Sequence, residues 1–135
     1  MSSLISIYIG GFLTLVIAFY HTQLYKKLNW SEEFDKIDIN NAKIFYTINL
    51  ALTILFFLIG AISIFYAREL SESNGLAFGF CFSYSIFWIW RLIWQVTYQK
   101  KGKEQNSNQP EIAKILIPFV IAFCYIFPFI SNTFL

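Results

Sequence analysis

Four long stretches of the chain are almost free of charge, and this feature constrains the fold more than any other. A helix needs about 20 apolar residues to cross the roughly 30 Å hydrocarbon core of a bilayer, and about 17 suffice. None of the stretches shows the polar outer stripe of a helix in a soluble bundle. The sequence therefore predicts an all-α, four-transmembrane-helix antiparallel bundle in a single membrane domain, 1–135, with spans at about 4–22, 44–67, 76–98 and 113–131. The first stretch lacks the basic start and cleavage site of a signal peptide, so we expect it to be retained.

Basic residues are unevenly distributed between the segments that join these spans. The segments after spans one and three carry eight lysines, counting Lys114 at the edge, whereas the opposite side carries Arg68 alone. Because lysine and arginine concentrate on the cytoplasmic side, both segments are predicted to be cytoplasmic and both termini extracytoplasmic. The net charge of +2 follows from this topology. The basic residues form no dense patch of the kind that nucleic-acid binding requires.

The first cytoplasmic segment mixes charges of both signs with aromatic residues that suit a membrane interface. Ser31 can cap a short helix whose first turn is acidic. We expect a short interfacial helix there, with Phe34 and Ile37 against the bilayer. The segment between spans two and three is predicted to be a tight loop that ends at Gly75, and residues 100–111 a polar loop.

Arg91 lies on a polar stripe of the third span. Steps of three and four residues collect nearly every polar group of that span on one line: Ala77, Cys81, Tyr84, Trp88, Arg91, Gln95 and Tyr98. A membrane helix with one polar seam turns the seam toward protein and its other sides toward lipid. Arg91 is therefore predicted to face the interior. The other spans carry seams that include Thr53 and Tyr125 together with small and hydroxyl residues that packing alone explains: Gly10, Thr14, Ala18, Gly60 and Ser63.

Polar side chains from several spans are predicted to share one layer. At a rise of 1.5 Å per residue, His21, Asn49, Arg91 and Gln95 lie about 5 to 10 Å below the cytoplasmic boundary. Tyrosines ring the same level. The predicted ligand-binding residues are Arg91, Gln95, Asn49, His21, Tyr46, Tyr84, Tyr98 and Trp88.

No span contains an acidic residue that could neutralise Arg91. Three arrangements would satisfy its guanidinium. Glu32, Glu33 or Asp35 could fold back to it, neighbouring amides and phenols could accept from it, or an anionic lipid or substrate group could complete the site. The alternative is that Arg91 extends to the headgroups and its aromatic neighbours form an ordinary interfacial belt.

Metal and cofactor chemistry gains no support from the sequence. One histidine and two distant cysteines do not supply the three or four ligands of a zinc site, and we expect no metal and no cofactor. Cys81 and Cys124 are interpreted as small buried apolar residues, with a disulfide as the alternative. Phosphate-loop, nucleophile-elbow and zinc-protease motifs are absent.

The strings FYHTQLYKKLNWSEEF and FWIWRLIWQVTY resemble those of small uncharacterised four-span bacterial membrane proteins. The shared pattern is FWxxRLxxQxxY in the third span, which covers Phe87, Trp88, Arg91, Gln95 and Tyr98 among others. The resemblance implies a multi-pass protein of the bacterial inner (cell) membrane and no activity. By architecture only, the chain is also similar to membrane glutathione-transferase-like enzymes, although span two lacks their arginine-rich signature.

Three functions remain open. The first is a non-enzymatic protein whose inner-leaflet polar cluster binds a lipid-like anionic amphiphile or docks a partner subunit. The second is a small enzyme acting on an amphiphile, in which His21 or a tyrosine moves a proton. The third is a channel or transporter formed by a homo-oligomer or within a larger membrane complex, since one chain gives too tight a bundle for a wide pore.

Overall fold

The computed structural model describes residues 1–98 and 111–135, and these residues are helical nearly throughout, without a β-strand. Four of their helices are long and apolar enough to cross a membrane. This confirms the predicted all-α four-span bundle and identifies the chain as a multi-pass integral membrane protein. In chain order the elements are α1 (Ser2–Lys27), α2 (Trp30–Glu33), η1 (Phe34–Lys36), α3 (Ile39–Phe65), α4 (Ala67–Ser71), α5 (Gly75–Tyr98) and α6 (Glu111–Phe134).

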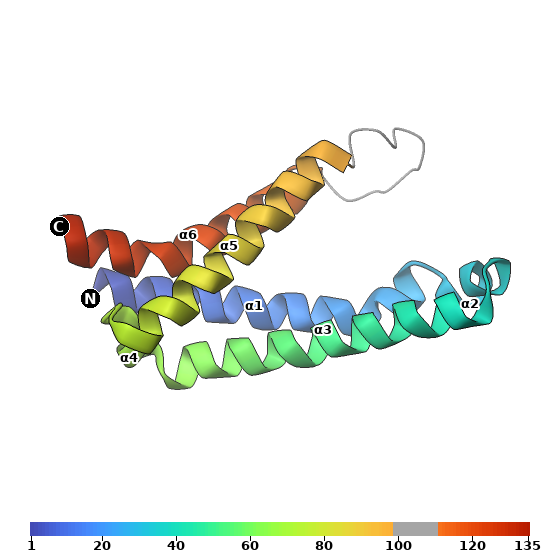
Figure 1. The fold of residues 1–135 in the computed structure, drawn as a ribbon, viewed down its shortest axis with the longest axis horizontal. Coiled ribbons are helices and arrows are strands. Elements are labelled where there is room, and N and C mark those ends of the chain that lie inside the picture. Colours follow the sequence, from blue (N-terminus) through green and yellow to red (C-terminus); the bar gives the residue numbers. More distant parts are fainter. Residues whose placement is uncertain (99–110) are drawn as a thin grey trace.

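Both chain termini lie at one end of the bundle together with α4, and α2 lies at the opposite end (Figure 1). These ends are named the termini end and the α2 end. Helices α1 and α5 both run from the termini end toward the α2 end and are therefore parallel, whereas α3 and α6 run back. Which end faces the cytoplasm stays a prediction from the distribution of the lysines.

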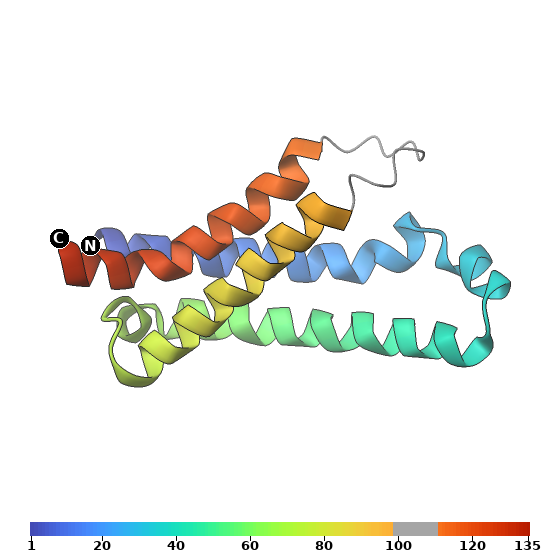
Figure 2. The same cartoon turned by 45° about the horizontal axis from the view of Figure 1, so that its top comes forward.

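The four long helices form two pairs. Helix α1 packs along α3, and α5 packs along α6, while α1 also contacts α6 and so joins the pairs. The backbones of α3 and α5 hardly approach each other. Figures 1 and 2 show that α6 lies near α1 and that α5 begins beside α4 at the termini end, and that α5 and α6 together diverge from α1 and α3 toward the α2 end.

Glycines explain why the helices approach closely at the termini end. A Cβ atom at Gly10 would lie 2.8 Å from the Tyr125 ring on α6, and one at Gly11 would lie 2.9 Å from Cβ of Ser63 on α3. Small residues let membrane helices approach closely. Farther toward the α2 end, the aromatic rings of Phe56 and Trp88 lie between the pairs. The bundle is therefore tight at one end and spread at the other.

The expected short helix in the first connecting segment is present as α2 and η1. It begins after Asn29, which adopts the left-handed conformation with φ 50°, so the expectation of a cap at Ser31 is wrong. The ring of Phe34 packs against Trp30 and Phe45, at centroid distances of 4.9 and 6.4 Å. Aromatic contacts therefore fix this segment to α3. The loop expected after span two also contains the short helix α4.

Candidate functional site

The centre of the bundle holds one hydroxyl group from each of the four long helices. The Tyr84 hydroxyl on α5 lies 3.1 Å from Oγ1 of Thr14 on α1, and the Tyr125 hydroxyl on α6 lies 2.6 Å from Oγ of Ser63 on α3. The two tyrosine rings meet edge to face at a centroid distance of 4.7 Å. We name these four residues the hydroxyl cluster.

Hydrogen-bond donors in the hydroxyl cluster can be assigned from its backbone partners. Thr14 donates to the carbonyl oxygen of Gly10 at 2.8 Å, and Ser63 donates to that of Ile59 at 2.8 Å. Each hydroxyl has one proton, so Tyr84 must donate to Thr14 and Tyr125 must donate to Ser63. All four protons are used within the protein, which identifies the cluster as structural.

His21 and Asn49 form the first pair of predicted site residues. Nδ1 of His21 lies 2.9 Å from Oδ1 of Asn49, and Nδ2 of Asn49 donates to the His21 carbonyl oxygen at 3.2 Å. The two contacts hold α1 and α3 together near the α2 end. Both side chains are partly buried.

Arg91 and Gln95 form the second pair, on α5. Arg91 Nη1 donates to Oε1 of Gln95 at 2.8 Å, and the guanidinium carbon lies 5.0 Å from the Trp94 ring centroid. Gln95 is buried, whereas Arg91 is partly buried. Among the described residues, Gln95 is the hydrogen-bond acceptor of this guanidinium, and no carboxylate lies within ion-pair distance of it. The positive charge is thus not neutralised by the described part of the chain.

His21 and Arg91 both lie beyond the Thr14–Tyr84 contact along their helices. Thr14 and Tyr84 are in contact on the parallel helices α1 and α5. Seven residues farther along each helix, which is about two turns, stand His21 and Arg91. Each of these side chains therefore lies about 10 Å closer to the α2 end along its own helix, in the direction in which α5 diverges from α1.

No hydrogen bond links the two pairs within the described ranges 1–98 and 111–135, and aromatic rings fill part of the space between them. Phe56 on α3 contacts the His21 ring at a centroid distance of 5.3 Å and stacks on Trp88 at 5.7 Å. One aromatic ring therefore spans the distance from the histidine on α1 to α5. Trp88 is buried, and its indole Nε1 has no hydrogen-bond acceptor among the described residues.

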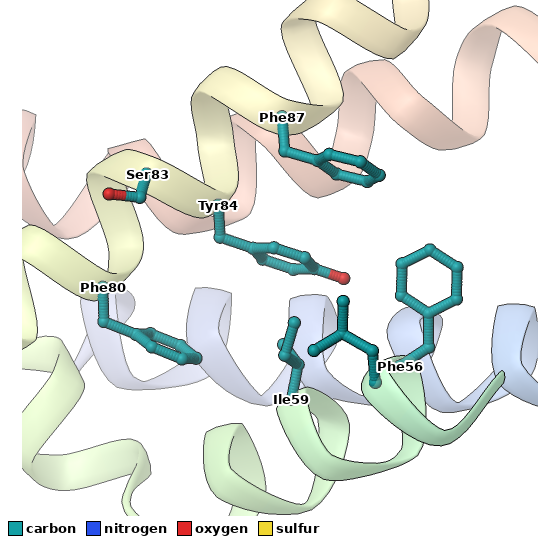
Figure 3. A pocket seen from close by; sticks show the side chains of 7 residues that line it. Phe56, Ile59, Phe80, Ser83, Tyr84 and Phe87 are labelled. Carbon is teal, nitrogen blue, oxygen red and sulfur yellow. The ribbon is translucent and has the colours of Figure 1, made fainter. Parts of the chain in front are cut away.

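A cavity of about 290 Å³ lies between α3 and α5, where their backbones are apart. Figure 3 shows the side chains that point into it from the two helices. Its walls are almost entirely apolar, and it is partly open rather than enclosed. We name it the α3–α5 groove, lined by Leu55, Phe56, Ile59, Phe80, Ser83, Tyr84 and Phe87.

The remaining predicted site residues are separated. Tyr46 is exposed near the α2 end, with its ring 6.3 Å from that of Tyr25. Tyr84 belongs to the hydroxyl cluster, two turns away from Arg91. The side chain of Tyr98, which ends α5, lies outside the described part of the structure.

The acidic residues that were considered as partners of Arg91 remain near α2. Asn29 donates to Glu32 at 2.7 Å, and Lys36 donates to Glu33 at 2.7 Å. The first of the three arrangements considered for Arg91, a fold-back of one of these carboxylates, is therefore not present among the described residues. Cys81 and Cys124 are buried and free, as the preferred interpretation had it. The described His, Cys, Asp and Glu residues form no group of three that could hold a metal ion.

The sequence assigned Thr14 and Ser63 to packing and Tyr84 to the ligand-binding residues, and it did not indicate that these side chains meet in one cluster. Thr14, Ser63 and Tyr125 each stand on a predicted seam, and the signal that they meet was one hydroxyl group per span. The groove had no such signal, because exposed and groove-lining apolar residues look alike in the sequence.

Comparisons with protein families, with characterised proteins and with solved structures find no match for this chain. The resemblance to small four-span bacterial membrane proteins therefore stays a prediction. The functional argument depends on the geometry of the described residues.

Proposed function

We propose that this membrane protein binds an anionic amphiphile, with the anionic group at Arg91 and the acyl chain in the α3–α5 groove. The observation that carries the proposal is the guanidinium of Arg91, which lies within a span and faces no carboxylate among the described residues. In the predicted topology this site opens to the cytoplasmic leaflet of a bacterial inner membrane.

An arginine inside the bilayer is costly unless its charge is balanced, by about 3 kcal/mol on insertion scales. Arg91 has five N–H donors, and Gln95 uses one of them in the described part of the chain. A phosphate or carboxylate suits the planar fork of the remaining donors and also supplies the missing negative charge. The stack with Trp94 holds the guanidinium in place for such a contact.

The α3–α5 groove continues in line with Arg91. Phe80, Tyr84 and Phe87 line the groove at steps of four and three residues, and a further step of four reaches Arg91. At 1.5 Å per residue, this line is about 16 Å long. A ligand that follows it would place its anionic group at Arg91 and its apolar chain against the aromatic rings.

The other functions gain less from the geometry. The enzyme hypothesis required His21, Asn49, Arg91 and Gln95 to surround one cavity, but none of them lines the α3–α5 groove. A partner subunit that brings a carboxylate to Arg91 would satisfy the charge without using the groove. The lipid proposal uses both features.

The test is lipid retention by protein reconstituted in phosphatidylcholine nanodiscs with phosphatidylglycerol as a minor component. Lipid that stays bound after extraction is measured by native mass spectrometry. Wild-type protein is expected to be enriched in phosphatidylglycerol. Arg91→Gln should lose that enrichment by about tenfold or more, because hydrogen bonds to charged groups contribute roughly 1.5 to 3 kcal/mol. Arg68→Gln, at the other end of the bundle, is the matched control and should bind as wild type does.

A pair of leucines tests the tail position. Both Leu55 and Leu58 are exposed on α3, but only Leu55 lines the groove. Leu55→Trp should fill the groove and reduce lipid retention, and Leu58→Trp should not. Equal retention of phosphatidylglycerol by wild type and Arg91→Gln would refute the proposal, and co-purification of a protein that depends on Arg91 would favour partner docking instead.

A further inference from the structure

The hydrogen bonds of Asn49 fix the tautomer of His21. Because Nδ2 of Asn49 donates to the His21 carbonyl oxygen, its Oδ1 is the atom that faces Nδ1 of the imidazole. A carbonyl oxygen can only accept, so Nδ1 carries the proton. In the neutral ring, Nε2 is then an acceptor, and among the described residues it has no donor.

His21 faces the space between the two helix pairs. On α1, Gly10 meets Tyr125 on α6 and Thr14 meets Tyr84 on α5. His21 continues this stripe by two turns toward the α2 end, and α5 and α6 diverge from α1 in that direction (Figure 2). Its partial exposure agrees with that position. Nε2 is therefore an unused acceptor among the described residues, on a ring that contacts Phe56 between the two helix pairs.

We propose that the headgroup bound at Arg91 carries a hydroxyl group beside its phosphate, and that this hydroxyl donates to Nε2 of His21. This inference rests on the proposed function and names the ligand class as a phosphodiester lipid with a hydroxylated headgroup, of the glycerol kind. One aromatic ring, Phe56, spans the distance between His21 and Trp88, the residue one turn from Arg91. A phosphate with a short hydroxylated chain is of comparable length.

Charge decides between a hydroxyl and an amine as the donor. The ammonium group of a phosphatidylethanolamine headgroup would stand beside the guanidinium of Arg91, and like charges in a partly buried site repel. A hydroxyl group donates the same hydrogen bond without a charge. Asn49 acts here as a positioning residue, because it directs the acceptor nitrogen away from α3.

The test is competition between two lipids of equal charge and identical acyl chains. Phosphatidylglycerol carries headgroup hydroxyls, and phosphatidylmethanol carries none. Each is offered in phosphatidylcholine nanodiscs to wild type, His21→Phe and Asn49→Leu, with retention measured by native mass spectrometry. Wild type should prefer phosphatidylglycerol by roughly fivefold, because this ratio of affinities corresponds to the free energy of one neutral hydrogen bond. His21→Phe should abolish the preference, and Asn49→Leu should weaken it.

Retention of phosphatidylmethanol provides the folding control, since variants with an intact site should bind it as wild type does. If wild type binds both lipids equally and Arg91→Gln binds neither, the hydroxyl inference is wrong and the proposed function stands. A preference that survives in His21→Phe would also overturn it, because the hydroxyl would be recognised elsewhere. If wild type enriches neither anionic lipid over phosphatidylcholine, the proposed function and this inference both fail.

Discussion

Gly10 on α1 packs directly against α6, so Gly10→Ala tests the contact that joins the two helix pairs. The new methyl group would lie 2.8 Å from Cε2 of Tyr125 and 3.0 Å from Cβ of Cys124. Tyr125 is fully buried, and its hydroxyl is held by Ser63 at 2.6 Å. The ring therefore cannot turn away without losing that hydrogen bond, and the helices must separate slightly.

The expected cost follows from a comparison with a second glycine. Overpacking a well-packed core by a methyl group costs about 1 to 3 kcal/mol. Replacing glycine by alanine inside a helix also favours the helix by about 1 kcal/mol. Gly79 lies inside α5 and has no atom within 4 Å of its would-be Cβ. Gly79→Ala should be stabilised by the higher helix propensity of alanine alone. The difference in the free energy of unfolding between the two variants therefore measures the cost of the contact at Gly10.

The assay is unfolding of the purified protein in mixed micelles with increasing sodium dodecyl sulfate, followed by tryptophan fluorescence and circular dichroism. Gly10→Ala should be less stable than Gly79→Ala by about 1 to 3 kcal/mol. Equal free energies of unfolding for the two variants would show that α1 and α6 do not approach at Gly10. The reasoning about the closed end of the bundle would then be wrong.

Two further predictions concern the same region. Tyr125→Phe should lower the free energy of unfolding by about 0.6 to 1.7 kcal/mol, because Ser63 keeps its bond to Ile59 and no donor is left unpaired. A double-mutant cycle with Ser63→Ala measures the pair, and a coupling energy of zero would contradict the hydrogen bond. In a Cys81→Ala background, Gly10→Cys should form a disulfide with Cys124 on mild oxidation, since a Cβ at position 10 lies 3.0 Å from that of Cys124. The average Cβ separation in disulfides is about 3.8 Å, so only a small shift is needed. Gly79→Cys should form none, and mass spectrometry of peptides distinguishes the two.

The spans were predictable because apolar length is set by the membrane rather than by details of packing. The second predicted span, at about 44–67, corresponds to α3 at Ile39–Phe65. The boundary differs because the helix begins in the polar segment, where Asp38 accepts a hydrogen bond from the Asn40 backbone. Hydropathy does not register a helix end that is determined by such a cap.

The inward-facing seams were also predictable. Thr14, Gly60 and Ser63 are all buried, as small and hydroxyl residues at helical spacing indicated. The sequence could not show which seams meet, because spacing along one helix carries no information about its neighbours. Tyr84 and Arg91 stand on the same line of α5, yet Tyr84 contacts α1 while Arg91 contacts residues of its own helix.

The separation of the predicted polar layer into two pairs follows from residue size along the seams. At the termini end the seams contain Gly10, Gly11 and Gly60, and a Cβ at each would lie within 3 Å of a neighbouring helix. Toward the α2 end they contain Phe56 and Trp88, whose stacked rings hold α3 and α5 apart. His21 and Arg91 therefore contact different partners, Asn49 on α3 and Gln95 on α5, with the rings of Phe56 and Trp88 between the two helix pairs. Such a spacing disfavours a closed polar core and suits a bound group that reaches both helix pairs.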